Sequence, residues 1–406
     1  MVAKIYRAYA RGNLIFQILV GIVLGIFFGA AFADVALHIS VLGDLFVGAL
    51  KAIAPLLVFV LVLTSICTRD FGQHGAQFRR VLLLYLLGTF LASLIAVGVS
   101  LFVSLDLVLN VEKAGNASPE NIGAVFKTLL FKLVDNPIHA LSNGNFLGVL
   151  TWAVAFGLAL KNCNATAKVI FLDINTAMLK VVRFIVRLSP VGIFALVTFS
   201  VAQTGAAGLL SYARLLVVLV ATMLFLAFVV NAVIVFLVTG KNPFPLIFIC
   251  IKHSAIFAFF TRTGAANIPV NLALCEKLGI EKDLYSVSIP LGATINMEGA
   301  AITIAVMSLA AAQTLGIDIS FGQALLLSLV ATLGALGASG VPGGSLLLIP
   351  LACSFLQIDY DVAMQVVAVG FIIGVVQDSV ETALNCSTDV LFTAACSHNQ
   401  LNLKFA

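Results

Sequence analysis

Charged residues are scarce in this sequence. Only 10% of its 406 residues are Asp, Glu, Lys or Arg, whereas roughly 25% are charged in soluble domains. Hydrophobic residues make up 61% of the chain, and the mean hydropathy is +1.14. This composition excludes an ordinary soluble domain and indicates an integral membrane protein.

The marks of several other protein classes are also missing. The seven cysteines are scattered, odd in number and mostly inside apolar runs, so we interpret them as small buried hydrophobic residues. No Gly-rich phosphate loop supports ATP-driven transport, and no nucleic-acid partner is expected. The stretch 337–340 matches the short GxSG motif of intramembrane proteases. However, none of the five histidines lies centrally in a long apolar run, so an enzyme is only a remote alternative.

Long apolar runs occupy most of the chain. Each is long enough to cross a hydrocarbon core of about 30 Å as a helix, and helices are the default because lipid offers the backbone no hydrogen-bond partners. Before residue 241 the runs lie at about 14–33, 41–68, 79–108, 122–160, 166–202 and 208–240. The first run exceeds the apolar core of a typical signal peptide, so we interpret it as a spanning helix. The sequence therefore predicts an all-α, multi-pass membrane protein.

The connections between the runs alternate in charge. Basic connections are marked by Lys4, Arg7 and Arg11, then Arg69, Arg79 and Arg80, then Lys161 and Lys168, and then Lys241. Under the positive-inside rule these connections face the cytoplasm, which places the N-terminus there, and Lys404 places the C-terminus there too.

Two later segments interrupt the apolar pattern with clusters of tiny or polar residues. They read FFTRTGAANIPV at 259–270 and LGASGVPGGSLLLIP at 336–350. Unwound backbone at membrane depth is tolerated only where it is buried in protein or lines a cavity. We therefore predict two re-entrant helical hairpins, the first entering from the cytoplasm and the second from outside. Such an inverted repeat is typical of transporters that bind their substrate near the midplane.

Five polar residues of the stretch QDSVETALNCSTD, at 377–389, share one helix face. At about 100° per residue, all five fall within an arc of about 100°. They are Asp378, Glu381, Thr382, Asn385 and Asp389. A central aspartate costs roughly 2.5–3.5 kcal/mol on insertion scales. This face must therefore meet protein, water or bound ions.

Positive charge is missing where these acids need it. The sequence between Lys282 and Lys404 holds no Lys or Arg, and only Arg262 stands at a hairpin tip. Unless some carboxyls are protonated, cations from outside the protein must balance the acids. The stretch PLGATINMEGAA at 290–301 predicts a locally opened helix, whose carbonyls suit a small hard cation such as sodium. A metal ion and a substrate ammonium could both balance the charge of these acids.

At NMEGA, GVPGG and D-x-x-E-T-x-x-N-x-x-x-D the sequence resembles the dicarboxylate/amino acid:cation symporters, the glutamate-transporter family, over nearly its whole length. The resemblance implies eight transmembrane helices, two re-entrant hairpins, a homotrimer among membrane lipids in the bacterial inner membrane, and an elevator mechanism. The implied scaffold holds 1–75 (spans 1 and 2) and 111–205 (spans 4 and 5). The implied transport domain holds 76–110 (span 3), 206–242 (span 6), 243–281 (hairpin 1), 282–317 (span 7), 318–357 (hairpin 2) and 358–406 (span 8 and tail).

The resemblance also implies the site residues. Co-transported sodium would bind Gly292, Asn296, Asn385 and Asp389 at one site, and carbonyls near Thr294, Ala335, Leu336 and Ala338 at another. An amino acid substrate would lie among Arg262, Thr263, Gly264, Met297, Val341, Gly343, Asp378, Glu381, Thr382 and Asn385, with Asp378 on its amino group. Some relatives hold a third ion where Glu298, Gly88 and Thr89 stand here, and we leave that site open.

Glu381 is the departure that decides the substrate. Members that transport acidic amino acids carry an arginine at this position. A carboxylate there would repel an acidic substrate, because two like charges at ~4 Å cost about 4 kcal/mol at an effective dielectric of 20. The sequence therefore favours serine and threonine, whose hydroxyl could donate a hydrogen bond to Glu381. Alternatives remain: Glu381 pairing with Arg262, proton coupling through Glu298 and Glu381, an acidic substrate, or a channel.

Overall fold

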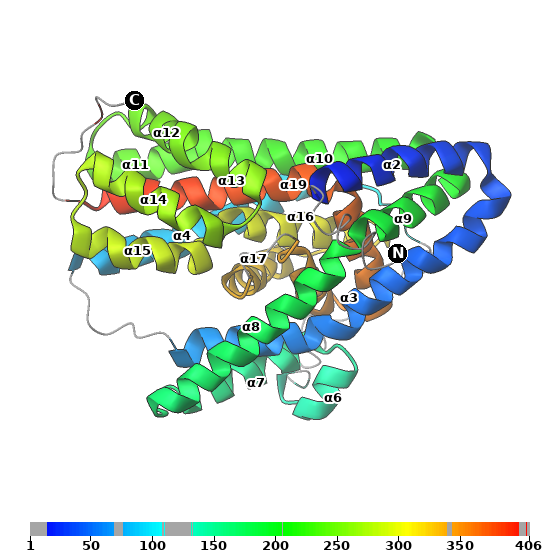
Figure 1. Ribbon diagram of the computed structural model, residues 1–406, viewed down its shortest axis with the longest axis horizontal. Helices are drawn as coiled ribbons and strands as arrows, with labels where there is room; N and C mark the ends of the chain where they lie inside the picture. Colours follow the sequence, from blue (N-terminus) through cyan, green and yellow to red (C-terminus); the bar gives the residue numbers. More distant parts are fainter. Residues whose placement is uncertain are drawn as a thin grey trace, which may run out of the picture.

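The computed structural model describes residues 14–68, 76–107, 109, 131, 133–204, 206–338, 343–397 and 403. Within these residues all regular secondary structure is helical and no strand occurs (Figure 1). The prediction of an all-α protein is therefore confirmed for the described part of the chain.

The chain before residue 240 supplies mostly long helices. They are α2 (Leu14–Ala31), α3 (Ala33–Thr68), α4 (Ala76–Phe102), α6 (Pro137–Ser142), α7 (Phe146–Ala159), α8 (Ala165–Arg187), α9 (Ser189–Thr204), α10 (Ala206–Phe225), the π-helix η1 (Leu226–Val230) and α11 (Asn231–Thr239). Helix α3 begins directly after α2, whereas the sequence predicts the second run from about 41. The polar residues before 41 belong to this helix and do not form a connection.

The second half is built from shorter, interrupted helices. They are α12 (Phe244–Cys250), the π-helix η2 (Ile251–Ala255), α13 (Ile256–Thr261), α14 (Gly264–Leu278), α15 (Lys282–Ile295), α16 (Glu298–Thr314), α17 (Phe321–Leu336), the 3₁₀ turn η3 (Leu346–Leu348), α18 (Ile349–Phe355) and α19 (Tyr360–Ala395).

Six helical stretches of the described residues are long and apolar enough to cross a membrane. They are His38–Thr68, Ala76–Phe102, Leu210–Thr239, Phe244–Thr261, Lys282–Thr314 and Tyr360–Ala395. A seventh results if α8 and α9, which are bent by 47° at their junction, count as one span. The protein is thus built to cross a membrane several times.

Two groups of helices are visible in Figure 1. Helices α2, α3, α7, α8 and α9 pack on one another, whereas α4 and the helices from α10 onward gather around α16 and α19. Apolar 18-residue stretches within 282–314 and 360–395 are 100% and 83% buried inside the protein. The two helices that carry the polar motifs are therefore the centre of the second group.

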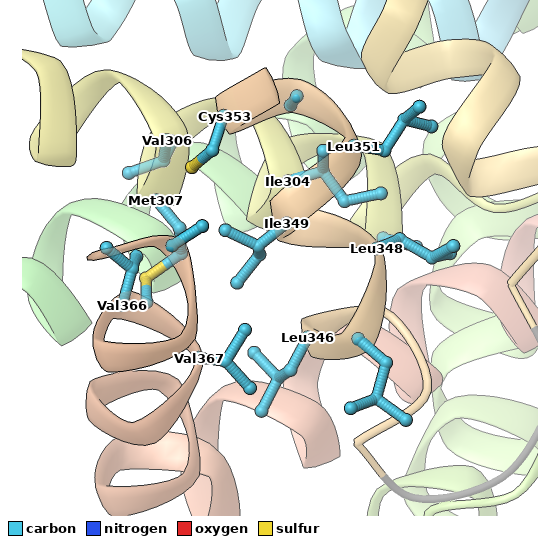
Figure 2. Close-up of a cluster of buried hydrophobic side chains, with 14 of the residues drawn as sticks. Ile304, Val306, Met307, Leu346, Leu348, Ile349, Leu351, Cys353, Val366 and Val367 are labelled. Carbon is cyan, nitrogen blue, oxygen red and sulfur yellow. The ribbon is translucent and has the colours of Figure 1, made fainter. Parts of the chain in front are cut away.

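An apolar cluster fixes one end of this centre. Figure 2 shows side chains of α16, of η3 and α18, and of α19 meeting in one layer: Ile304, Val306, Met307, Leu346, Leu348, Ile349, Leu351, Cys353, Val366 and Val367. Because lipid is as apolar as these side chains, their close packing rather than escape from water holds the helices together. The cluster sets the position of η3 against α19.

Local breaks in the helices position the polar residues. The chain leaves helical geometry at Asn296 and Met297, between α15 and α16. Between α13 and α14 it turns at Arg262, which has a φ of +51°. That left-handed conformation is rare outside glycine. A strained residue at the point where a helix pair turns fits a functional position.

Candidate functional site

The polar face of α19 is buried inside the helix group. Its five residues surround a small cavity together with Arg262, Gly264, Ala293, Met297, Ala338 and Cys386. The cavity holds about 20 Å³, room for little more than one water molecule. The structure therefore brings residues from the α13–α14 turn, from the chain after α17, from α15 and from α19 together around a small site.

Asp378 contacts two other segments of the chain. Its Oδ2 lies 2.7 Å from the Nε of Arg262, and its Oδ1 accepts a hydrogen bond of 3.2 Å from the N–H of Gly343. Arg262 also donates from Nη2 to the carbonyl of Gly374 at 3.0 Å. Arg262 is only 7% exposed and Asp378 3%, so this is a buried ion pair. Removal of either partner would leave an uncompensated charge.

Glu381 has a different set of partners. Its Oε2 accepts hydrogen bonds from Thr303 Oγ1 at 2.7 Å and Ser345 Oγ at 2.8 Å, and from Gln377 Nε2. These three hydrogen bonds all end on Oε2, and Glu381 also lines the small cavity. Arg262 pairs with Asp378 and not with Glu381, so the alternative Glu381–Arg262 pair is not formed in this structure.

Asn296 and Asp389 lie together at the break between α15 and α16. Asn296 donates from Nδ2 to Asp389 Oδ1 at 3.0 Å and to Thr388 Oγ1 at 2.8 Å. A Cβ at Gly292 would lie 2.6 Å from Asp389 Oδ1, which shows how closely the carboxylate approaches this helix. Asn385 accepts the Gly299 N–H through Oδ1 at 2.8 Å. The residues implied for one sodium site are therefore adjacent.

The oxygen atoms of this group suit a small hard cation. Asn296 Oδ1 is buried and accepts no hydrogen bond from the described residues, while its amide already contacts the Asp389 carboxylate. An unpartnered buried acceptor beside a carboxylate is costly unless a cation binds. The donor set of amide, carboxylate and backbone oxygens is the one that sodium prefers.

The second implied sodium set is less closely gathered. Thr294, Leu336 and Ala338 line a large cavity of about 760 Å³, and Thr294 Oγ1 bonds within its own helix to the Leu291 carbonyl. Ala335 is buried, and its carbonyl already accepts the Ala338 N–H at 2.9 Å. These residues lie near one another without a preformed ring of free oxygens.

The remaining substrate residues lie beside one of two cavities or outside the described residues. Gly264 and Met297 line the cavity, and Thr382 does too, although its hydroxyl bonds to the Asp378 carbonyl of its own helix. Thr263 lines the large cavity instead. Val341 lies outside the described residues.

The large cavity separates the two helix groups. Its walls come from α3 and α8 on one side and from α14, α15 and the end of α17 on the other. Ala293 and Ala338 line both cavities. These two small side chains therefore border both the small cavity and a space large enough for an amino acid.

Glu298 occupies a pocket of its own. It is fully buried, and its Oε2 accepts a hydrogen bond of 2.8 Å from Asn231 Nδ2. Its Oε1 accepts none from the described residues, and a Cβ at Gly88 would lie 2.4 Å from that oxygen. Glycine at 88 makes room for the longer glutamate, and the nearby Thr89 hydroxyl accepts the Met297 N–H at 3.3 Å.

Several residues that contact Glu381 or Asp389 were hard or impossible to predict from the sequence. Ser345, Thr303 and Gln377 hold Glu381, and Tyr85 donates to the Asp389 carbonyl at 3.0 Å. Ser345 directly follows the GVPGG motif, and Gln377 begins the polar stretch of α19, so both had a positional signal. Thr303 and Tyr85 had none, because they sit in ordinary apolar runs.

Comparison with known proteins shows the family of this chain. The chain is 65% identical over 403 residues to the serine/threonine transporter SstT of Campylobacter jejuni subsp. jejuni serotype O:23/36 (strain 81-176), and the match covers 99% of both chains. It is 64% identical over 403 residues to the protein of the same name from serotype O:6 (strain 81116 / NCTC 11828), with the same coverage. These relatives are transporters and not enzymes. The family model of the sodium:dicarboxylate symporters matches residues 14–399, and the chain therefore belongs to the sodium:dicarboxylate symporter family.

Proposed function

We propose that this protein is a secondary active symporter that imports the small neutral hydroxy amino acids serine and threonine together with sodium ions. Relatives that match the whole chain are named serine/threonine transporters. The observation that carries the substrate class is Glu381: its Oε2 accepts hydrogen bonds from Thr303 and Ser345, and Glu381 lines the same small cavity as Asp378. A ligand that brings an ammonium and a hydroxyl satisfies both carboxylates.

The substrate binds in an expanded form of the small cavity. Its ammonium takes the position on Asp378 that the Arg262 guanidinium holds in this structure. Its hydroxyl donates to Glu381 Oε1, and its carboxylate meets the N–H groups at the start of α14, where Thr263 and Gly264 stand. A helix N-terminus is a favourable place for that carboxylate. Met297, Thr382, Asn385, Val341 and Gly343 complete the site.

Sodium binds beside the substrate, at the break between α15 and α16. Gly292, Asn296, Asn385 and Asp389 hold one ion, supported by the unpartnered Asn296 Oδ1. The second ion uses Thr294, Ala335, Leu336 and Ala338. Because Asn385 belongs to both the sodium and the substrate sets, the two ligands are coupled, and by linkage each strengthens the binding of the other by the same factor.

The architecture follows the family resemblance: eight transmembrane helices, two re-entrant hairpins at 243–281 and 318–357, and a homotrimer in the bacterial inner membrane with cytoplasmic termini. The helices of the first group form the scaffold, and those of the second group move as an elevator. The 760 Å³ cavity between the two groups supports this division, because two bodies that slide past one another need not fill the space between them.

Radiolabelled serine uptake into proteoliposomes tests the proposal. Uptake should require an inward sodium gradient, and excess threonine should compete while aspartate should not. Competition by aspartate would favour the acidic-substrate alternative. Uptake driven by a proton gradient alone would favour proton coupling, and flux without saturation would favour a channel.

A further inference from the structure

The turn of α19 that carries Asn385 and Asp389 receives hydrogen bonds on its main chain from two other helices. Asn271 of α14 donates from Nδ2 to the Cys386 carbonyl at 2.9 Å, and the Tyr85 hydroxyl of α4 donates to the Asp389 carbonyl at 3.0 Å. A carbonyl oxygen has two lone pairs, so each can accept a side-chain donor in addition to the N–H of its own helix. The backbone of the proposed sodium site is therefore tied to two helices that supply none of the ligands assigned to that site.

Asn271 is fixed in its orientation, because both ends of its amide are engaged. Its Oδ1 accepts hydrogen bonds from Ser254 Oγ at 2.6 Å and from Asn267 Nδ2 at 3.0 Å. All three side chains are at most 1% exposed. A flip of the Asn271 amide would turn its oxygen toward the Cys386 carbonyl and leave buried groups poorly paired, which is costly. Ser254 also lies in the π-helix η2, an irregularity that is frequent at functional positions.

Tyr85 is held closely as well. Its side chain is fully buried, and its ring lies against Phe392 with the centroids 6.3 Å apart. Its hydroxyl also lies 3.0 Å from Thr393 Oγ1. A Cβ at Gly292 would lie 2.9 Å from the Tyr85 hydroxyl oxygen and 2.6 Å from Asp389 Oδ1. The hydroxyl thus stands where α15 approaches α19, and it limits how closely these two helices can approach each other.

The spacing of these backbone segments bears on which cation the site can hold. A cation binds well only when the oxygens can reach its own bonding distance, so selectivity depends on the size of the site and on the flexibility of its ligands. Lithium is smaller than sodium, and its ligands must come closer to it. A turn of α19 that is held by two fixed donors resists this contraction, whereas a released turn can follow the smaller ion.

We propose that Asn271 and Tyr85 are positioning residues that make the ion site selective for sodium over lithium. They contact no ion themselves. They hold the carbonyls of Cys386 and Asp389, and with them the side chains of Asn385 and Asp389, at the spacing that sodium needs. This inference rests on the proposed function for its ion. Helices α4 and α14 then take part in the choice of ion, although neither supplies an ion ligand.

Melting temperatures of the purified full-length protein, titrated with sodium or lithium chloride at constant ionic strength and without amino acid, measure the affinity for each ion. The wild type should bind sodium more tightly than lithium, and equal affinities would overturn the inference. Tyr85→Phe should weaken sodium binding about tenfold, the scale of one hydrogen bond, and lithium binding much less. The matched control is Tyr212→Phe on α10, a buried tyrosine whose hydroxyl contacts Ser200 Oγ at 3.2 Å. An unchanged ratio of the two affinities in Tyr85→Phe would also overturn the inference, because a merely structural loss weakens both ions alike.

Asn271→Ala removes the second donor. Its control is Ser254→Ala, which removes a hydrogen bond of the same cluster but leaves the Asn271 amide on the Cys386 carbonyl. Both variants should melt at a lower temperature without ions, but only Asn271→Ala should bring the two ion affinities together. Equal changes of the ratio in both variants would overturn the role of Asn271. If Asn271→Ala does not fold, Tyr85→Phe decides the question.

Serine uptake by the wild type in proteoliposomes separates this inference from the proposed function. Uptake should be faster with an inward sodium gradient than with an equal lithium gradient. If neither gradient supports uptake, the proposed function fails, while the ion-induced shifts of the melting temperature still decide whether Tyr85 and Asn271 set the preference for sodium.

Discussion

The guanidinium of Arg262 lies 2.7 Å from the carboxylate of Asp378, and both side chains are buried. A cation from the α13–α14 turn thus neutralises the acid that we assign to the substrate ammonium. Under the proposed function, the substrate ammonium replaces the guanidinium at this carboxylate, so Asp378 keeps a cationic partner both before and after binding.

Arg262→Met should make the protein depend on its substrate for stability. Breaking a buried pair costs roughly 3–5 kcal/mol, and the serine ammonium can replace the lost cation. Serine in sodium buffer should therefore raise the melting temperature more in this variant than in the wild type. Arg183→Met is the control, because Arg183 lines the large cavity away from Asp378. The same serine-induced shift in all three proteins would contradict the exchange.

Glu381→Arg should abolish serine uptake. The substitution reverses the charge that accepts the substrate hydroxyl and removes the acceptor of Ser345, Thr303 and Gln377. Aspartate should bind the variant although it does not compete with serine in the wild type, because the new cation attracts a second carboxylate. The measurement is competition against labelled serine in the wild type and direct aspartate binding in the variant. Unchanged selectivity would refute the assignment of Glu381.

Asp389→Asn should weaken sodium dependence. The sodium concentration for half-maximal serine uptake should rise about a hundredfold or more, since a unit charge at ~4 Å is worth about 4 kcal/mol at an effective dielectric of 20. Asp361→Asn, at an exposed position in the first turn of the same helix, should leave the sodium curve unchanged. A wild-type sodium curve in Asp389→Asn would remove Asp389 from the ion site.

Gly88→Ala should destabilise the protein, because its Cβ would lie 2.4 Å from Glu298 Oε1. Overpacking of this kind typically costs about 1–3 kcal/mol. Glu298→Asp shortens the acid by one methylene, so the double variant should recover part of the loss in a double-mutant cycle of melting temperatures. Gly98→Ala on the same helix has open space around it and serves as the control. If the losses of melting temperature were additive, the side chains at positions 88 and 298 would not compete for the same volume.

Acid should loosen the connection before α6, which lies outside the membrane-spanning helices. The side chain of Asn145, and next that of His139, hold the pKa of Asp135 below its ordinary value. A depressed pKa in the folded state stabilises the fold above the unfolded pKa of roughly 3.9, and this contribution is lost as the pH falls through the folded pKa.

The only tryptophan of the sequence reports this loss, since Trp152 Nε1 donates to the Asp135 carbonyl at 2.7 Å. Tryptophan fluorescence should change below a pH of about 4 in the wild type, and this step should be absent in Asp135→Asn. Asp173→Asn on α8 is the matched exposed acid. An identical acid transition in Asp135→Asn would exclude Asp135 as its cause.

The sequence predicted which polar residues share one helix face better than how these residues pair. Because helix periodicity is regular, the amino-acid order alone assigns Asp378, Glu381 and Asp389 to one face of α19. Which of the acids Arg262 would meet depends on a left-handed turn at Arg262 itself, and no periodicity encodes that turn. Ser345 reaches Glu381 through the 3₁₀ geometry of η3 and its packing, and these too are tertiary effects.

Irregular helix turns account for other contacts that the sequence did not predict. The π-helix η1 ends directly before Asn231, and η2 interrupts the first arm of the 244–278 segment. A π-turn shifts the face of every later residue relative to a regular helix. The contact between Asn231 and Glu298 therefore could not be found from a 3.6-residue period, although both residues are polar and stand in apolar runs.

The break at Asn296 and Met297 also has an electrostatic consequence. It places the C-terminal end of α15 and the N-terminal end of α16 next to each other in the protein interior. Each end carries a partial charge of roughly half a unit, negative at the carbonyl end and positive at the amide end. Glu298 stands in the first turn of α16, where the positive end favours an acid, while the carbonyl end of α15 faces the group around Asp389. The backbone itself thus supplies a fixed dipole pair that no side-chain substitution removes.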